Sequence, residues 1–176
     1  LTVKELFSQL LQKRAGDVKE STLARYRFLI ERHILPALGE LTVNKLTAER
    51  LQSFLNEKRA NGALRGGGLS AKSVRDICVL VRSALRLAAE IFPSVEAMSH
   101  VKLPPYRQRK IQVLSEGEIQ RIAAYALASP TPENIGILLC LNTGLRLGEL
   151  CALRWSDIDF YSGTVRVERT VQRVNF

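Results

Sequence analysis

The 176 residues include 26 Lys and Arg against 17 Asp and Glu, which gives a net charge of +9, and 46% of them are hydrophobic. That apolar content argues against a disordered chain, and no unbroken apolar run in the sequence is long enough to cross a membrane. The positive charge indicates a polyanionic partner such as nucleic acid, because cations that neutralise phosphates release condensed counterions. A basic surface that is merely solvated is the alternative.

The first two predicted helices show start and stop signals. Thr2 and Glu5 have the spacing of a capping box, and the apolar periodicity that follows them ends before Gly16. Ser21 is the predicted cap of the second helix, and Pro36 is its predicted end because proline removes a backbone donor and clashes with the preceding turn.

Two more amphipathic helices follow. Thr47 caps the third, which ends at Asn61 and Gly62, and Ser70 caps the fourth and longest. Four such helices with short connections predict a compact bundle over residues 1–97. The expected inward stripe of the fourth helix is Val74, Ile77, Cys78, Val81, Leu85 and Ala88.

Residues 98–112 predict an extended basic linker. Pro104 and Pro105 are adjacent, which excludes a helix and favours an extended chain. The stretch has no acidic side chain and four basic ones, Lys102, Arg107, Arg109 and Lys110.

A second domain is predicted over residues 113–176. It begins at another capping box, Ser115 with Glu118, and contains a helix at 135–141 that is apolar on every side and is expected to be buried. Residues 164–171 alternate with period two and predict a strand. A helix pair with a lone strand is an unfinished domain, because a strand needs partners.

Positive side chains gather at the starts of the second and fourth predicted helices and in the linker. A helix N-terminus carries free amide donors and the positive end of the helix dipole, so it favours a phosphate. Arg and Lys there can also reach base edges in a major groove. The alternative is that they form the solvated outer face of a bundle. The predicted DNA-binding residues are Thr22, Arg25, Arg27, Ser70, Lys72, Ser73, Arg75, Arg82, Lys102, Arg107, Arg109 and Lys110.

One motif is more specific than composition. Residues 142–159 read N-T-G-L-R-L-G-E-L-C-A-L-R-W-S-D-I-D and resemble the first arginine motif of the tyrosine recombinases, also called phage integrases. Residues 21–39 and 69–74 look like the core-binding domain of that family, and residues 113–119 like the start of its catalytic domain. Residues 169–174 are similar to integrases of conjugative transposons and temperate phages. The resemblance covers essentially the whole chain.

The resemblance implies roles for individual residues. Arg146 matches the first catalytic arginine, and a planar, permanently charged guanidinium suits a phosphate clamp. Glu149 matches an acidic position that helps orient the active site; a simple charge partner of Arg146 is the alternative. Trp155 is expected in the core. Asp157 and Asp159 are expected to make caps and turn bonds rather than to hold a metal ion.

The expected fold is therefore mainly α. A four-helix SAM-like core-binding domain is followed by an incomplete α/β catalytic domain with helices and the first strand or hairpin. The resemblance implies double-stranded DNA as the partner, a 3′-phosphotyrosyl intermediate, a tetramer on DNA for the intact enzyme, and no metal or other cofactor. It also implies DNA integration and recombination by a mobile element, in the cytoplasm, by a bacterial or phage-encoded protein.

The other catalytic groups of the family have no match in this sequence. No lysine follows Lys110, no histidine follows His100, and none of the four tyrosines follows a His-x-x-Arg. We expect a chain truncated before the nucleophile, which binds DNA and does not cut it. A non-catalytic DNA-binding regulator or architectural protein that retains half of the clamp is the alternative.

Overall fold

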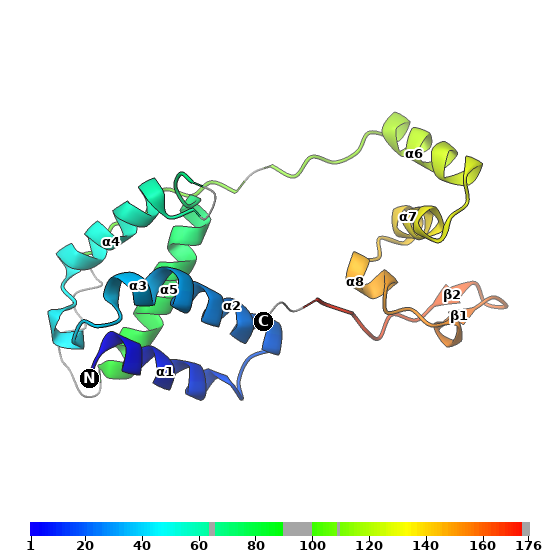
Figure 1. Cartoon of the computed structure of the whole chain (residues 1–176). Coiled ribbons are helices and arrows are strands. Elements are labelled where there is room, and N and C mark those ends of the chain that lie inside the picture. Colours follow the sequence, from blue (N-terminus) through cyan, green and yellow to red (C-terminus); the bar gives the residue numbers. More distant parts are fainter. Residues whose placement is uncertain (64–65, 90–99, 109, 174–176) are drawn as a thin grey trace. The chain divides into compact units, whose positions relative to one another are not determined.

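The computed structural model describes residues 1–63, 66–89, 100–108 and 110–173 (Figure 1). It divides into two compact units, Leu1–Gln108 and Arg109–Arg173. Within the described residues, no helix combines the length and the apolar character that crossing a membrane requires. The fold is mainly helical, as predicted.

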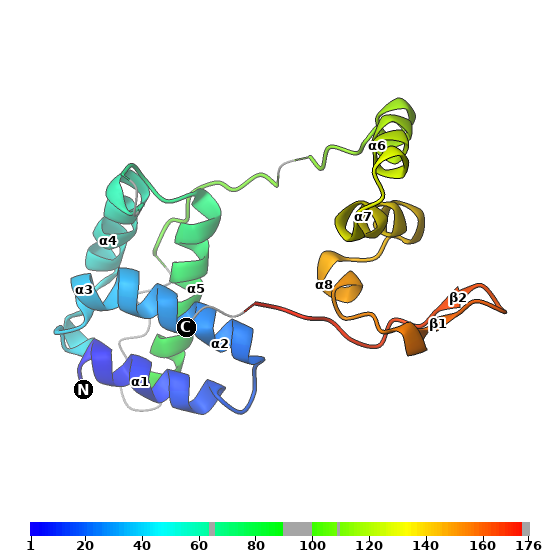
Figure 2. The ribbon, with the colours of Figure 1, turned by 45° about the vertical axis from the view of Figure 1, so that its right-hand side comes forward.

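The first unit is a helical bundle built around its longest helix. In Figures 1 and 2 this helix, α5, crosses α1 and the short π-helical segment, and it contacts both of them as well as α4. The elements in chain order are α1 (Val3–Arg14), α2 (Glu20–Leu29), the π-helix η1 (Ile30–Ile34), α3 (Leu35–Leu38), the 3₁₀ helix η2 (Val43–Lys45), α4 (Ala48–Asn61) and α5 (Ala71–Ala88).

The apolar stripe predicted for α5 is confirmed. All six of its side chains are buried, and they pack with buried side chains of α1 and α4 such as Phe7 and Phe54. The predicted caps Thr2, Thr47 and Ser70 each accept a hydrogen bond from a backbone N–H three residues on. The helices α1, α4 and α5 therefore begin at their predicted caps, and their buried side chains pack in one common core.

The second predicted helix differs from its prediction in two ways. Lys19 is the N-cap of α2 and makes no side-chain cap bond, so Ser21 lies inside the helix. Pro36 does not end the helical run, because the chain passes through η1 and continues as α3 to Leu38. Pro36 lies in the first turn of α3, directly after η1, a position in which a proline is tolerated.

The described residues of the second unit form three α-helices, one 3₁₀ helix and one hairpin. Ser115 and Glu118 form the predicted capping box of α6, and Thr131 caps α7. The elements are α6 (Glu116–Ala128), α7 (Pro132–Thr143), α8 (Leu147–Leu150), the 3₁₀ helix η4 (Trp155–Asp157), β1 (Ile158–Asp159) and β2 (Thr164–Val165). The hairpin is antiparallel, with Ile158 opposite Val165.

Three expectations for this unit are wrong. The strand predicted over 164–171 is limited to Thr164–Val165, because β1 offers only two residues to pair with. The helix expected to be buried has Ile135 and Ile137 55% and 45% exposed, although α7 packs mainly on α6 and also contacts α8. Trp155, expected in the core, is 82% exposed.

Candidate nucleic-acid interface

Two of the predicted basic helix starts meet at one carboxylate. The Arg25 guanidinium on α2 donates to Asp76 on α5, with 2.5 Å between Nη2 and Oδ2. Lys72, one turn before Asp76, has its Nζ 3.8 Å from the other carboxylate oxygen. Arg25 and Lys72 remain 58% and 61% exposed. Cations that lie far apart in the sequence thus form one exposed group across α2 and α5.

The start of α5 is fixed by its own serines. The Ser70 hydroxyl accepts from the Ser73 backbone N–H at 3.1 Å, and the two hydroxyl oxygens are 2.9 Å apart. Both predicted residues therefore act in the helix cap. This cap holds the turn that carries Lys72.

The two other predicted DNA-binding residues of α2, Thr22 and Arg27, do not join Arg25. Thr22 is half-buried in the first turn. Arg27 lies two residues after Arg25, so the two side chains point to different faces of the helix. Arg27 pairs instead with Glu20, at 3.4 Å between Nη1 and Oε1. The structure thus separates Arg27 from the group formed by Arg25 and Lys72.

On α5, the two further predicted arginines have different surroundings. Arg75 is half-buried, and its Nε donates to the carbonyl oxygen of Pro104 at 3.0 Å. Arg82, about two turns further along the helix, is exposed. Arg75 therefore contacts the predicted linker at Pro104, a contact that its position in the sequence did not reveal.

The linker cations are exposed where the structure describes them. Lys102, Arg107 and Lys110 all have exposed side chains, and Arg109 lies outside the described residues. The backbone of Lys102 is held by Gln52 of α4, which sequence reasoning missed. No pattern marks such a residue, because an amide on the outer side of an amphipathic helix looks like any solvated side chain.

The predicted catalytic arginine lies at a sharp turn in the second unit. Gly144 ends α7 with φ 72°, a left-handed conformation that favours glycine, and its N–H donates to Cys140 at 2.9 Å. Arg146 follows as the N-cap of α8, and its side chain is 85% exposed. The turn therefore presents the guanidinium to solvent.

Glu149 holds Arg146 at two points. One carboxylate oxygen accepts from the Arg146 backbone N–H at 2.9 Å, and the other from Nη1 at 3.0 Å. The backbone bond, then the guanidinium bond and charge, lower the pKa of Glu149 below its ordinary value. The charge-partner interpretation thus describes the observed contact, and this contact also orients the arginine.

Two glycines allow the close packing around α8. A Cβ on Gly148 would lie 2.5 Å from Thr170 Oγ1 and 2.6 Å from the carbonyl oxygen of Val171, whose N–H donates to Gly148 at 2.9 Å. A Cβ on Gly136 of α7 would lie 3.0 Å from Leu150 Cδ2. The glycine after Arg146 in the motif is therefore needed where a later chain segment crosses the helix.

The two aspartates at the end of the motif make the caps and turn bonds predicted for them. Asp157 accepts from the Arg154 backbone N–H at 2.9 Å and pairs with Arg169, whose hydrogen bonds lower the pKa of Asp157. Asp159 accepts from two backbone N–H groups of the following turn. The Ser162 side chain, and then these two backbone groups, lower the pKa of Asp159. Both carboxylates stabilise the hairpin and its entry.

Comparison with known families agrees with this arrangement. A model described as the phage integrase N-terminal SAM-like domain matches residues 2–59, and the model of the phage integrase family matches residues 112–175. Together the two matches cover more than half of the chain. The chain belongs to the phage integrase family of tyrosine recombinases.

Individual relatives in the family are distant. The chain is 27% identical over 193 residues to the putative defective protein IntQ of Escherichia coli K12, covering 100% of this chain and 46% of the relative. It is 31% identical over 134 residues to tyrosine recombinase XerC of Xanthomonas campestris pv. campestris, covering 74% and 40%. The chain thus spans about half of the length of its relatives, or less.

Solved integrases share the fold. The Tn1549 transposon integrase, in complex with transposon right end DNA, superposes with a TM-score of 0.79 at 18% identity, over 98% of this chain and 54% of that one. A lambda integrase dimer bound to a COC′ core site gives a TM-score of 0.72 at 25% identity, over 90% and 43%.

Proposed function

We propose that this chain binds duplex DNA as part of a site-specific recombinase that serves DNA integration for a mobile element. The observation that carries the proposal is that two exposed cations from different helices, Arg25 and Lys72, meet at Asp76. The family match to integrases supports the same conclusion. Further exposed cations add positive charge to the first unit and the linker; they are Arg82, Lys102, Arg107 and Lys110. Such cations bind the phosphate backbone and release its counterions.

Arg146 is proposed as the phosphate clamp of the intact enzyme. Its guanidinium is exposed at a turn fixed by Gly144 and oriented by Glu149, so it can offer parallel donors to two phosphate oxygens. In the intact enzyme a tyrosine oxygen attacks the phosphorus, the 5′-oxygen leaves, and a 3′-phosphotyrosyl bond results. The arginine neutralises charge that develops on the phosphate in that step.

The assembly and the setting follow from the same proposal. A lambda integrase neighbour was solved as a tetramer bound to a Holliday junction, and we extend a tetramer on DNA to the intact form of this protein. Its place would be the bacterial cytoplasm, where the DNA is. A regulator without catalysis is not favoured, because residues 112–175 match the integrase family model beyond the SAM-like domain.

Titration of binding against salt tests the proposal. Affinity for a fluorescent duplex should fall by orders of magnitude from about 50 to 200 mM salt if several phosphates are contacted. The double variant Arg25→Ala, Lys72→Ala should reduce the slope of log affinity against log salt by about 2. The matched control Lys4→Ala, Lys45→Ala removes two exposed cations outside α2, α5 and the linker. Equal slopes for the two double variants would overturn the proposed interface.

A further inference from the structure

Within the predicted linker, residues 101–104 are attached to the first unit. Val101 and Leu103 lie against the hydrophobic core, while the Lys102 side chain between them is exposed. This alternation is that of an extended segment with one face buried. From Pro105 to Gln108, in contrast, every side chain is exposed.

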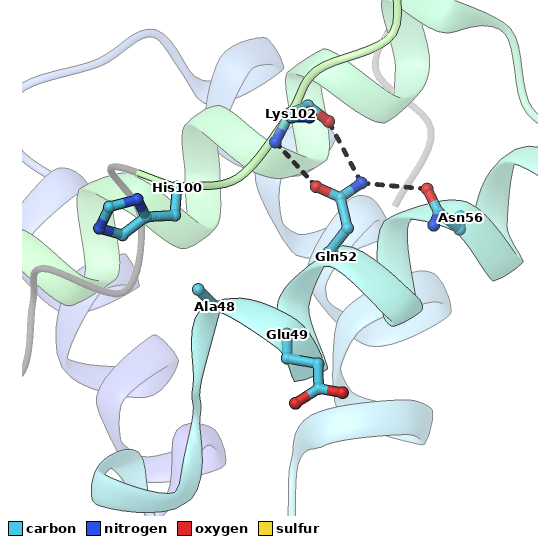
Figure 3. Close-up of a pocket in the computed structure, with 6 residues that line it drawn as sticks. All are labelled: Ala48, Glu49, Gln52, Asn56, His100 and Lys102. Atoms are coloured by element: carbon cyan, nitrogen blue, oxygen red, sulfur yellow. Dashed lines mark hydrogen bonds between the residues drawn. The ribbon is translucent and has the colours of Figure 1, made fainter.

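Gln52 of α4 binds the backbone of this segment through both ends of its amide. The Lys102 N–H donates to Oε1 at 2.7 Å, and Nε2 donates to the Lys102 carbonyl oxygen at 3.2 Å (Figure 3). Nε2 also donates to Asn56 Oδ1 at 3.0 Å, one turn further along α4. The side-chain amide thus offers Lys102 the donor and acceptor that a neighbouring strand would offer.

Arg75 of α5 makes a second attachment two residues later. Its Nε donates to the Pro104 carbonyl oxygen at 3.0 Å. Pro104 and Pro105 have no backbone N–H, so a carbonyl is the polar backbone group that this dipeptide can offer. The segment is therefore held by α4 at Lys102 and by α5 at Pro104.

We propose that Gln52, together with Arg75, is a positioning residue that fixes residues 101–104 to the first unit, so that the free connection to the second unit begins at Pro105. The consequence for binding rests on the proposed function. A shorter free tether raises the effective concentration of the second unit on the DNA that the first unit holds.

Limited trypsin digestion of the 176-residue chain tests the attachment without DNA. Trypsin can cleave after Lys102, Arg107 and Lys110, whose side chains are all exposed. We expect cleavage after Lys102 to be at least about tenfold slower than after the other two, because the bond must first detach from the unit. Equal initial rates at the three sites in the unmodified chain would overturn the proposal.

The variant Gln52→Ala should bring cleavage after Lys102 close to the rate after Arg107. Its matched control is Gln9→Ala, which removes an exposed amide from the surface of α1 and should leave the ratio of rates unchanged. Hydrogen exchange gives a second readout, in which Gln52→Ala should lose protection at the Lys102 amide while amides of α5 stay protected, showing that the unit is folded. An unchanged ratio or retained Lys102 protection would overturn the role of Gln52.

Binding of a duplex separates this proposal from the proposed function. Gln52→Ala should weaken binding about twofold through the longer tether, with the same salt slope because no cation is removed. A chain that binds no duplex would end the proposed function, and the trypsin ratio would still decide whether the attachment exists. An unchanged affinity beside an altered trypsin ratio would overturn the tether consequence.

Discussion

Arg25 on α2 and Asp76 on α5 are joined by an ion pair of 2.5 Å, and this pair connects the two helix starts that carry the predicted DNA contacts. Lys72 approaches the same carboxylate from one turn earlier in α5. The acid therefore balances two cations that would otherwise repel each other. It also opposes the approach of any phosphate to them.

Asp76→Asn should change stability and DNA affinity in opposite directions. Loss of the partly exposed pair should lower the free energy of unfolding by about 0.5 kcal/mol. Affinity for duplex at low salt should rise, because one negative charge leaves the interface. Urea unfolding and fluorescence anisotropy measure the two effects. Asp17→Asn, an exposed acid between α1 and α2, is the control; an equal rise in affinity with it would show that net charge alone matters.

The stability of the first unit should depend on pH through His33. This side chain is 5% exposed on the π-helical segment, and burial, with the positive charges of Lys58 and Arg32, lowers its pKa below the ordinary 6.5. As pH falls, the unfolded chain takes up the proton first, so the free energy of unfolding is complete above about pH 6.5 and declines below it.

Urea unfolding followed between pH 7.5 and 5.5 checks this dependence. One such group contributes a slope of at most about 1.4 kcal/mol per pH unit. His33→Leu should flatten the curve in this range. The carboxylates with lowered pKa values, such as that of Glu5, lose their contribution only at lower pH, below their ordinary 4.5. A curve that is equally steep with leucine would contradict the assignment.

Gly148→Ala should disrupt the crossing of the chain over α8. The new methyl group would meet Thr170 and the carbonyl oxygen of Val171 at less than contact distance. We expect faster hydrogen exchange at the Val171 amide, which donates to Gly148. Gly117→Ala on α6 is the matched control, because its Cβ would meet nothing within 4 Å. Alanine there should be neutral or slightly stabilising, since it favours a helix.

Hydrogen exchange should also differ between the two units. The first unit holds 22 of the 23 buried hydrophobic residues of the described chain, and the remaining one, Ala126, lies in the second unit. Amides of α5 should therefore exchange slowest, and those of α6 and α7 much faster, because few apolar contacts oppose local opening. Similar protection in both units would show that the second unit has a core of its own in solution.

The 176-residue chain should form no covalent adduct with a nicked suicide substrate. The sequence has no lysine after Lys110 and no tyrosine after a His-x-x-Arg, so the groups that complete the family's chemistry have no match here. Arg146→Ala should leave duplex affinity within about twofold, since one phosphate contact is a small part of the total. A protein–DNA band that resists denaturation on a gel would refute the first expectation.

Much of the first unit was predictable because each helix satisfies its own local rules. The stripe of α5 and the hydroxyl caps are short-range signals, and tertiary packing reinforces them. Pro36 was misread because a π-helical segment before it changes the register, which a period of 3.6 residues does not reveal.

The candidate site was predictable in composition and less so in contacts. Arg25 and Lys72 were both expected at an interface, but their meeting at Asp76 depends on how α2 crosses α5. The attachment of Lys102 by Gln52 joins positions 50 residues apart and has no local signature. The prediction that Trp155 is buried was wrong, because the apolar character of a side chain favours its burial but does not show that another part of the protein covers it.

The long helix α5 joins the core to the interface. Its apolar side is locked against α1, α4 and η1 along its length, while its first turn carries Lys72. A helix packed in this way resists rigid-body movement and fraying when a ligand binds at its N-terminus. The backbone that carries Lys72 is thus preorganised, so binding of an anion there does not have to order the main chain as well as the lysine side chain.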